Sequence, residues 1–200
     1  MTYIYYYYSP LGGITVSSNG SEITGLWFDG QKYFGDTLPK EYAQGRAFLH
    51  PQQAGGLRLI RDGERGLPIF EAAKKWLDIY FSGEAPDFTP PLRMETTSFR
   101  KAVWEIMLTI PFGQTMTYGG IADRIAKQKG LAAMSAQAVG GAVAHNSISL
   151  IIPCHRVVGT NGSLTGYAGG IEKKVQLLMM EKADMSQCHD AGVKSPATEP

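Results

Sequence analysis

Residues 149–170 read SLIIPCHRVVGTNGSLTGYAGG and set a thiol in an unusual place. The apolar run 149–153 is typical of a short buried strand. Because proline cannot continue a central strand, we expect this strand to end at Pro153. Cys154 then lies at the strand end, with His155 and Arg156 directly behind it. A thiol beside a basic pair at a strand end indicates a chemical role that other residues must support.

Cys154 has two interpretations from the residues alone. A free cysteine is among the most buried residue types, so a small core residue is the ordinary one. Three features favour a reactive thiol: the strand end at Pro153, the adjacent His155 and Arg156, and Glu181 among the methionines of a later helix. A thiol of pKa about 8.5 is mostly protonated at neutral pH, so it needs a base, and the base needs an orienting group. Cysteine, histidine and carboxylate supply these three roles.

Other kinds of site find little support in the sequence. Cys154 and Cys188 are the only two cysteines, too few for a disulfide scaffold or a thiolate metal site. The four histidines are scattered, and no CxxC, HxxxH, HExxH or GxxxxGK motif occurs. We therefore expect no metal and no cofactor.

Length and composition fit an ordinary globular chain. The 200 residues, of which 44% are hydrophobic, suit one large domain or two small ones. No apolar run approaches the roughly 18 residues that a membrane span needs. The first residues also lack the basic segment and cleavage site of a secretory signal. We expect a cytoplasmic protein, with its thiols reduced and without a membrane partner.

Charge is distributed unevenly along the chain. Residues 1–92 contain eight Lys/Arg against ten Asp/Glu, whereas residues 93–184 contain ten against six. The positive second half is compatible with a nucleic-acid surface. A solvated face explains the same excess about equally well.

The first half of the chain predicts a small sheet followed by one helix. The segments TYIYYYY, ITVSS and EITGLWF alternate in character and are separated by turn residues, which is typical of an antiparallel sheet. We interpret the tyrosine run as the two faces of one strand. Residues 31–66 lack periodicity and are predicted to be a loop. A helix with an apolar stripe then begins at Pro68 and ends at Gly83.

The stretch EAPDFTPPL, residues 84–92, marks a domain boundary. Its three prolines predict an extended linker. Sheet-forming residues dominate before it and helix-forming residues after it, so the pattern predicts an α/β (α+β) fold. We place an N-terminal βα domain over 1–90, a mainly helical domain over 91–185, and a disordered tail over 186–200.

Capping residues divide the second domain into short helices. Thr97-Ser98, Thr117 and Ser135 each precede an apolar helical pattern and are expected to cap it. The third of these helices stops near Asn146, and a last helix is expected over 172–183. Two short helices separated by a turn and followed by a strand match a helix-turn-helix order.

The third helix carries an unusual number of small residues. Gly140 and Gly141 each cost about 1 kcal/mol relative to alanine in a helix interior, and Ala138 and Ala142 flank them. Close packing against another helix would justify that cost. Close approach to a narrow surface such as a DNA minor groove would justify it equally well.

The motifs together resemble one known family. PCHRV is preceded by AVGGAV and by an asparagine before SISLII, and is followed by GSLTGYAGG and a helix ending LLMMEKA. VWEIMLTIPFGQTMTYGGIA and, more loosely, SPLGGITV and GLWFDGQ extend the match. The chain thereby resembles the O6-alkylguanine-DNA alkyltransferases. The resemblance implies a ribonuclease-H-like N-terminal domain, a winged helix-turn-helix-like domain, and a monomer that repairs double-stranded DNA without a cofactor.

The resemblance also implies roles for the candidate residues. Cys154 would accept an alkyl group from guanine O6 irreversibly, His155 would act as its base through a water, and Glu181 would orient His155. Asn146 matches the family's hinge residue between the recognition helix and the site. Tyr118 matches the tyrosine that donates to guanine N3. We expect the sulfur to be held ionised beside the imidazole, within reach of a base flipped out of the duplex.

Further positions are implied for the base pocket and the DNA surface. Tyr167, Ala168 and Val157 would line the pocket, with the Ala168 N–H available to O6. The recognition helix would enter the minor groove with Gln137 at its start and through its small face, that is Ala138, Gly140, Gly141 and Ala142. Gln137 stands where the family usually has an arginine, which predicts weaker phosphate contact or weaker base flipping.

Three other functions are compatible with parts of the pattern. A DNA-binding relative without transfer activity would lack the cysteine. A thiol hydrolase would need an oxyanion hole, and no helix is expected to begin at Cys154 to provide one. A transcriptional regulator would need an additional cysteine-rich metal domain. Alkyl transfer accounts for more of the quoted motifs than any of these.

Overall fold

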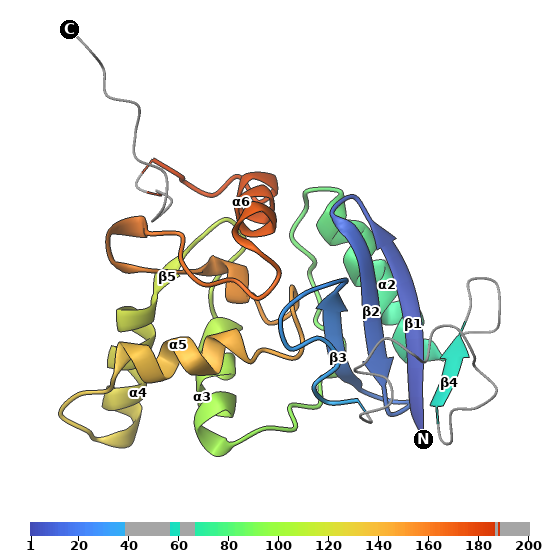
Figure 1. The fold of residues 1–200 in the computed structure, drawn as a ribbon, viewed down its shortest axis with the longest axis horizontal. Helices are drawn as coiled ribbons and strands as arrows, with labels where there is room; N and C mark the ends of the chain where they lie inside the picture. The colour runs from blue at the N-terminus through green and yellow to red at the C-terminus, as the bar shows by residue number, and fades with distance from the viewer. Residues whose placement is uncertain (39–56, 61–66, 187, 189–200) are drawn as a thin grey trace, which may run out of the picture.

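The computed structural model describes residues 1–38, 57–60, 67–186 and 188 (Figure 1). A strand-rich N-terminal part and a helical C-terminal part lie side by side, and residues 82–97 connect them. The mixed α/β (α+β) class is thereby confirmed. The tail expected over 186–200 falls almost entirely outside the described residues. None of the described helices has the length and apolarity to cross a bilayer.

One four-stranded sheet forms the N-terminal part. Its strands have the spatial order β3-β2-β1-β4 and are β1 (Thr2–Ser9), β2 (Gly12–Ser18), β3 (Ile23–Phe28) and β4 (Leu57–Ile60). Strands β1, β2 and β3 pair antiparallel, as the alternating pattern predicts. The antiparallel sheet of the first thirty residues is confirmed.

Strand β4 corrects the loop predicted over 31–66. It pairs parallel with β1, with Thr2 opposite Leu57. A four-residue strand is too short to show an alternating pattern of its own, and its partner is distant in the sequence. Residues 31–38 form a loop that consists mostly of turns, as predicted, and positions 39–56 and 61–66 lie outside the described residues.

The tyrosine run presents two faces, as predicted. Tyr5 and Tyr7 pack against aromatic rings of helix α2 (Pro68–Phe81), with ring centroids 5.6 and 6.1 Å apart. Tyr6 and Tyr8 lie on the opposite face, edge to face with each other at 4.9 Å. The alternation of side chains along a strand separates the run in this way.

Helix α2 covers one face of the sheet (Figure 1). Pro68 occupies its first turn, and Gly83 follows its end at φ +84°, a left-handed conformation that favours glycine. Both predicted limits are confirmed. The stripe that it buries consists of Ile69, Phe70, Ala73, Trp76, Leu77 and Tyr80.

The described C-terminal part contains four α-helices: α3 (Ser98–Met107), α4 (Tyr118–Lys129), α5 (Ala136–Ala144) and α6 (Ile171–Met180). The predicted caps are confirmed, because the hydroxyls of Thr97, Thr117 and Ser135 each accept a backbone N–H from the first turn. Helix α6 ends at Met180 rather than at residue 183, since Lys182 has φ +54° and leaves the helical path.

The strand predicted over 149–153 is wrong. The segment is a tight buried turn, in which Leu150 has φ +67° and the N–H of Ile152 donates to Ile148 O at 3.1 Å. An apolar run does not distinguish a strand from a buried turn. The preceding asparagine decides for the turn, because Asn146 bonds to the backbone at both Ile148 and Ile152.

The two parts share one hydrophobic core, and the buried turn is joined to the sheet. The N–H of Leu26 in β3 donates to Ser147 O at 2.8 Å, and the N–H of Ser149 donates to Leu26 O at 2.8 Å. Strand β3 therefore extends its pairing into the C-terminal part. The N-terminal sheet holds the turn that leads to Cys154.

Trp104 joins α3 to α5 and provides a test of this packing. It is 1% exposed, and its indole N–H donates to Ala142 O at 2.9 Å. Trp104→Phe leaves that carbonyl unpaired and removes buried ring volume, so we expect the free energy of unfolding to fall by about 2 kcal/mol. Urea denaturation measures the change. A loss below about 0.5 kcal/mol would show that the indole hydrogen bond contributes little.

Candidate active site

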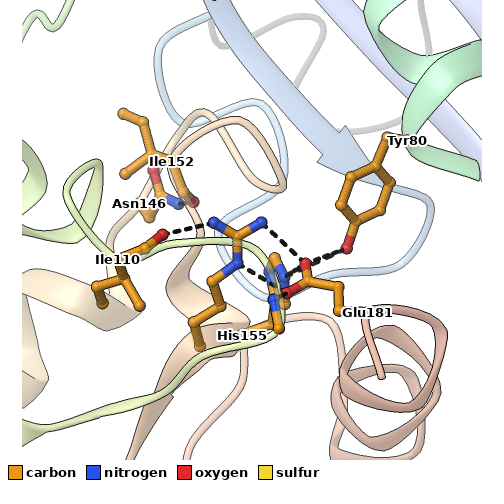
Figure 2. Close-up of polar contacts among 8 residues, drawn as sticks. Tyr80, Ile110, Asn146, Ile152, His155 and Glu181 are labelled. Carbon is orange, nitrogen blue, oxygen red and sulfur yellow. Dashed lines mark hydrogen bonds and ion pairs between the residues drawn. The ribbon is translucent and has the colours of Figure 1, made fainter. Parts of the chain in front are cut away.

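Asn146 ties the end of α5 to the turn before Cys154 (Figure 2). Its amide N–H donates to Ile152 O at 2.7 Å, and its side-chain oxygen accepts the N–H of Ile148 at 3.0 Å. Asn146 is buried, so water does not compete for these bonds. The residue expected to act as a hinge thus closes the turn that carries the cysteine.

Cys154 begins a short 3₁₀ helix, η2 (Cys154–Arg156), directly after Pro153, where the sequence predicts no helix start. It is only 3% exposed. Burial raises the pKa of its thiol, and hydrogen bonds from Asn146 and Ser149, with the charge of Lys174, oppose that rise without cancelling it. The sulfur is therefore protonated at neutral pH. This corrects two expectations, a position at a strand end and a sulfur held ionised at rest.

His155 is completely buried and bonded to Glu181. Its Nε2 lies 2.6 Å from Glu181 Oε1. Burial lowers the pKa of the imidazole, and the charges of Arg156 and Lys174 act in the same direction, although Glu181 opposes them. A neutral imidazole that donates from Nε2 keeps its lone pair on Nδ1. Nδ1 has no hydrogen-bond partner within the described residues, so it is available to accept a proton.

Glu181 is the centre of the polar network (Figure 2). Besides His155, it accepts Arg156 Nε–H on Oε2 at 2.9 Å, Arg156 Nη2–H on Oε1 at 3.0 Å, and the Gly113 N–H on Oε2 at 3.0 Å. Burial alone would raise its pKa, but the hydrogen bonds and charge of His155 and Arg156 outweigh this and lower it to about 2. Glu181 is therefore an ionised carboxylate facing a neutral imidazole.

Arg156 fixes the orientation of the Glu181 carboxylate. Its Nη1 donates to Ile110 O at 2.7 Å, and its guanidinium carbon lies 5.7 Å from the centre of the Phe112 ring. Both Glu181 oxygens receive a hydrogen bond from the same guanidinium. A planar guanidinium holds a carboxylate in a fixed orientation. Glu181 is thereby presented to His155 in one geometry.

Tyr118 is brought to the site by a small parallel sheet. Strand β5 (Met116–Thr117) pairs with β6 (Val157–Val158), which places the start of α4 beside the end of η2. The Tyr118 hydroxyl donates to the Thr165 and Gly166 carbonyls at 3.1 and 3.2 Å. Burial, and then the charge of a Cys154 thiolate, raises the pKa of Tyr118 to about 12. Its phenol is therefore a neutral donor.

The segment after β6 carries the other expected pocket residues. The Tyr167 ring lies 6.5 Å from the His155 ring, and its buried hydroxyl has no partner in the described part of the chain. Ala168 is partly exposed, and its carbonyl accepts the Lys32 N–H at 2.8 Å. Val157 is fully buried. The structure thus brings Tyr167 to the histidine, while the side chain of Val157 lies in the hydrophobic core.

The small residues of α5 divide between two faces. Gln137, Ala138 and Gly141 are exposed, and a Cβ added at Gly141 would meet nothing within 4 Å. Gly140 is partly exposed and faces the Tyr118 ring. Ala142 is 3% exposed and lies against α3, which corrects its expected place on the outer face. Close helix packing and an open surface therefore both account for the composition.

Tyr80 and Arg156 belong to this network but were not among the predicted site residues, and neither was Lys174, whose charge acts on Cys154 and His155. Tyr80 falls in the apolar stripe predicted for the helix that begins at Pro68, and the sequence marks Arg156 only as a neighbour of the thiol. Lys174 is fully buried, and its ammonium donates to Val157 O at 2.6 Å and Thr165 O at 3.2 Å. Burial lowers its pKa to about 8. The available signal was a tyrosine hydroxyl in an apolar stripe, since a buried phenol needs a partner.

Comparison with known proteins identifies both parts of the chain. A family model for the 6-O-methylguanine DNA methyltransferase ribonuclease-like domain matches residues 1–94, and one for the DNA binding domain of the same enzymes matches residues 98–183. A methylated-DNA–protein-cysteine methyltransferase from Mycobacterium tuberculosis is 38% identical over 175 residues, covering 88% of this chain and 89% of that protein. One from Haemophilus influenzae is 37% identical over 185 residues, covering 91% and 88%.

A solved structure resembles the whole fold. It is that of Mycobacterium tuberculosis OGT in complex with DNA, with a TM-score of 0.69 and 34% sequence identity. The match covers 93% of this chain and 94% of the other. The agreement therefore extends over both parts of the molecule.

The ionised Glu181 predicts a pH-dependent contribution to stability. Its pKa is about 2 in the folded chain against an ordinary 4.5, so the stabilisation is present above pH 4.5 and is lost as pH falls toward 2. We expect Glu181→Gln to lower the free energy of unfolding by about 3 kcal/mol at pH 7, with a gap that closes between pH 5 and 2. Denaturant titrations across this range measure it. The exposed Glu105→Gln is the control, and a gap independent of pH would contradict the assignment.

Proposed function

This chain belongs to the 6-O-methylguanine DNA methyltransferase family, and we propose that Cys154, His155 and Glu181 carry out its reaction. That reaction is the irreversible transfer of a methyl or other alkyl group from guanine O6 in DNA to the protein's own cysteine. One observation carries the assignment of residues. The Nε2 of His155, the residue that follows Cys154, lies 2.6 Å from Glu181 Oε1. The directions of the pKa shifts favour a protonated thiol, a neutral imidazole and an ionised carboxylate.

The proton transfer follows from these charge states. Nδ1 of His155 accepts the thiol proton through a bridging water, and Glu181 stabilises the imidazolium that forms. The thiolate then attacks the alkyl carbon on O6. The S–C bond forms as the C–O bond breaks, and the electron pair remains on guanine. Because a thioether resists hydrolysis, each chain acts once.

Tyr118 supplies the proton donor for the leaving guanine in our proposal. Its neutral phenol lies beside the Cys154 segment and donates to two carbonyls of the 165–166 turn in the unbound protein. When the flipped guanine binds, the Tyr118 hydroxyl would leave these two carbonyls and donate to guanine N3 instead. Donation there stabilises the negative charge that guanine acquires as the alkyl group departs.

The flipped base would be held by the segment that follows β6. Tyr167 supplies a ring on which guanine can stack, and the backbone N–H of Ala168 and the backbone of Val157 face its polar edge. The Ala168 carbonyl already accepts a hydrogen bond from the Lys32 N–H. This supports a role for the Ala168 N–H alone. Flipping costs a few kcal/mol and is cheapest for a poorly paired base such as an O6-alkylated guanine.

We propose that α5 enters the minor groove of duplex DNA. Gln137, Ala138 and Gly141 form the exposed face that supports this, and Gly140 lies between that face and Tyr118. Small side chains permit close approach to the DNA backbones. Gln137 would fill the space left by the flipped base. Ala142 belongs to the core and has no part in this surface.

Three broader assignments remain proposals. A monomer is supported because the network from Cys154 to Glu181 is assembled within one chain. A cytoplasmic setting is supported by the two free cysteines, which a reducing compartment preserves. A domain boundary near residue 90 is supported by the ranges that the two family models match, 1–94 and 98–183.

Cys154→Ser is expected to abolish methyl uptake from DNA containing labelled O6-methylguanine, while binding to that DNA persists. The serine hydroxyl is too weak an acid for the imidazole to ionise. Labelled protein on a denaturing gel measures uptake, and electrophoretic mobility shift measures binding. Cys188→Ser is the matched control and should take up label to one equivalent per chain. Repeated turnover by the wild-type protein would contradict a single-use acceptor and favour a hydrolase.

Gln137→Arg is expected to tighten binding to duplex DNA by about threefold to tenfold at low salt, because it adds one phosphate contact. The plot of log affinity against log salt should steepen by about 0.9. Fluorescence anisotropy at several salt concentrations measures both. Gln176→Arg adds the same charge on the exposed side of α6. Equal slopes for the two variants would mean that Gln137 does not face the DNA.

A further inference from the structure

Tyr80 of α2, in the N-terminal domain, contacts the proton relay formed by His155 and Glu181 (Figure 2). Its hydroxyl donates to Glu181 Oε1 at 2.8 Å and lies 3.3 Å from His155 Nε2. Tyr80 is fully buried. The same carboxylate oxygen thus receives a tyrosine and the catalytic imidazole.

We propose that Tyr80 is a positioning residue, through which the N-terminal domain sets the orientation and charge of Glu181 toward His155. The inference rests on the proposed function, because it assigns a role within the same relay. Its consequence is that the two domains form one active site. The N-terminal domain would then act on the chemistry as well as on the fold.

Aromatic packing fixes the ring of Tyr80 in addition to its hydrogen bond. It stacks on Trp76 at 5.2 Å with an angle of 7° between the planes, and it meets Phe81 and Phe112 edge to face at 5.3 and 5.9 Å. A tyrosine has few rotatable bonds, so such packing fixes the direction of its hydroxyl. Phe112 adjoins Gly113, which donates to the other Glu181 oxygen. The carboxylate is therefore held from both sides by rigid groups.

A buried phenol with a structural role needs only some acceptor, and a backbone carbonyl would serve. The Tyr80 hydroxyl ends instead on the oxygen that accepts the His155 proton. Burial, and then the charge of Glu181, raises the pKa of Tyr80 well above its ordinary value. The hydroxyl therefore remains a neutral donor at any pH at which the protein functions. By donating a hydrogen bond, it stabilises the negative charge on Glu181 Oε1 and adds no positive charge of its own.

Removal of that donor changes the basicity of His155. The other charged or titratable groups that act on His155 or Tyr80 are Arg156 of η2, Lys174 of α6, Glu181 just after α6, and the Tyr167 phenol. With Tyr80 replaced by phenylalanine, Oε1 keeps more negative charge and holds an imidazolium more tightly. The pKa of His155 then rises, and a larger fraction of the base is protonated at a given acidic pH.

Single-turnover kinetics separate this role from a structural one. In a protein that acts once, the amplitude of methyl uptake counts folded chains, whereas the rate constant reports the chemistry in each. We would measure both for the full-length wild type, Tyr80→Phe and Tyr7→Phe, from pH 5 to 9, with excess DNA containing labelled O6-methylguanine. Tyr7→Phe is the matched control, since its hydroxyl also donates to a carboxylate, Asp78 of α2, at 2.9 Å.

For Tyr80→Phe we expect the rate constant at pH 7 to fall about fivefold, because Glu181 loses the group that orients it toward His155, with the amplitude unchanged. The acidic limb of its pH profile should move to higher pH, and that of Tyr7→Phe should match the wild type. A Tyr80→Phe limb that stays in place or moves to lower pH overturns the inference, whatever the rate. Wild-type protein that takes up no label would contradict the proposed function itself, and the inference with it.

Discussion

The buried carboxylate of Glu181 is the interaction on which the rest of the site depends. An ionised group removed from water is costly unless hydrogen bonds and an opposite charge compensate it. Here the donors come from α2, from the 110–113 segment and from η2, while Glu181 itself follows α6. The requirement to satisfy one charge thus brings together four segments that are distant in the sequence.

Glycine at position 113 is part of that arrangement. Gly113 has φ +75°, and a Cβ there would lie 2.7 Å from the Glu181 carbonyl oxygen. The absence of a side chain lets the backbone approach closely enough for its N–H to reach the carboxylate. The same network accounts for the resting chemistry. With Glu181 ionised and His155 neutral, Cys154 keeps its proton, and a buried thiol is inert until a substrate changes its surroundings.

Local signals predicted most of the secondary structure, and the two main errors have different causes. The caps at Thr97, Thr117 and Ser135 were identified because a hydroxyl acts on the next turn of its own helix. The apolar run 149–153 was misread because burial makes a strand and a turn look alike, and the side chain of Asn146 decided between them. Strand β4 was missed because its partner lies in β1.

The sequence by itself determined which chemical groups are present and in what order: a cysteine next to a histidine, a later carboxylate, and helices whose caps are local. Only the tertiary structure decided that the thiol is buried and protonated, that Ala142 faces the core, and that Tyr80 of the N-terminal domain joins Glu181. The physical reason is distance along the chain. Charge states and hydrogen bonds depend on neighbours in space, and Tyr80 and Glu181 are 101 positions apart in the sequence.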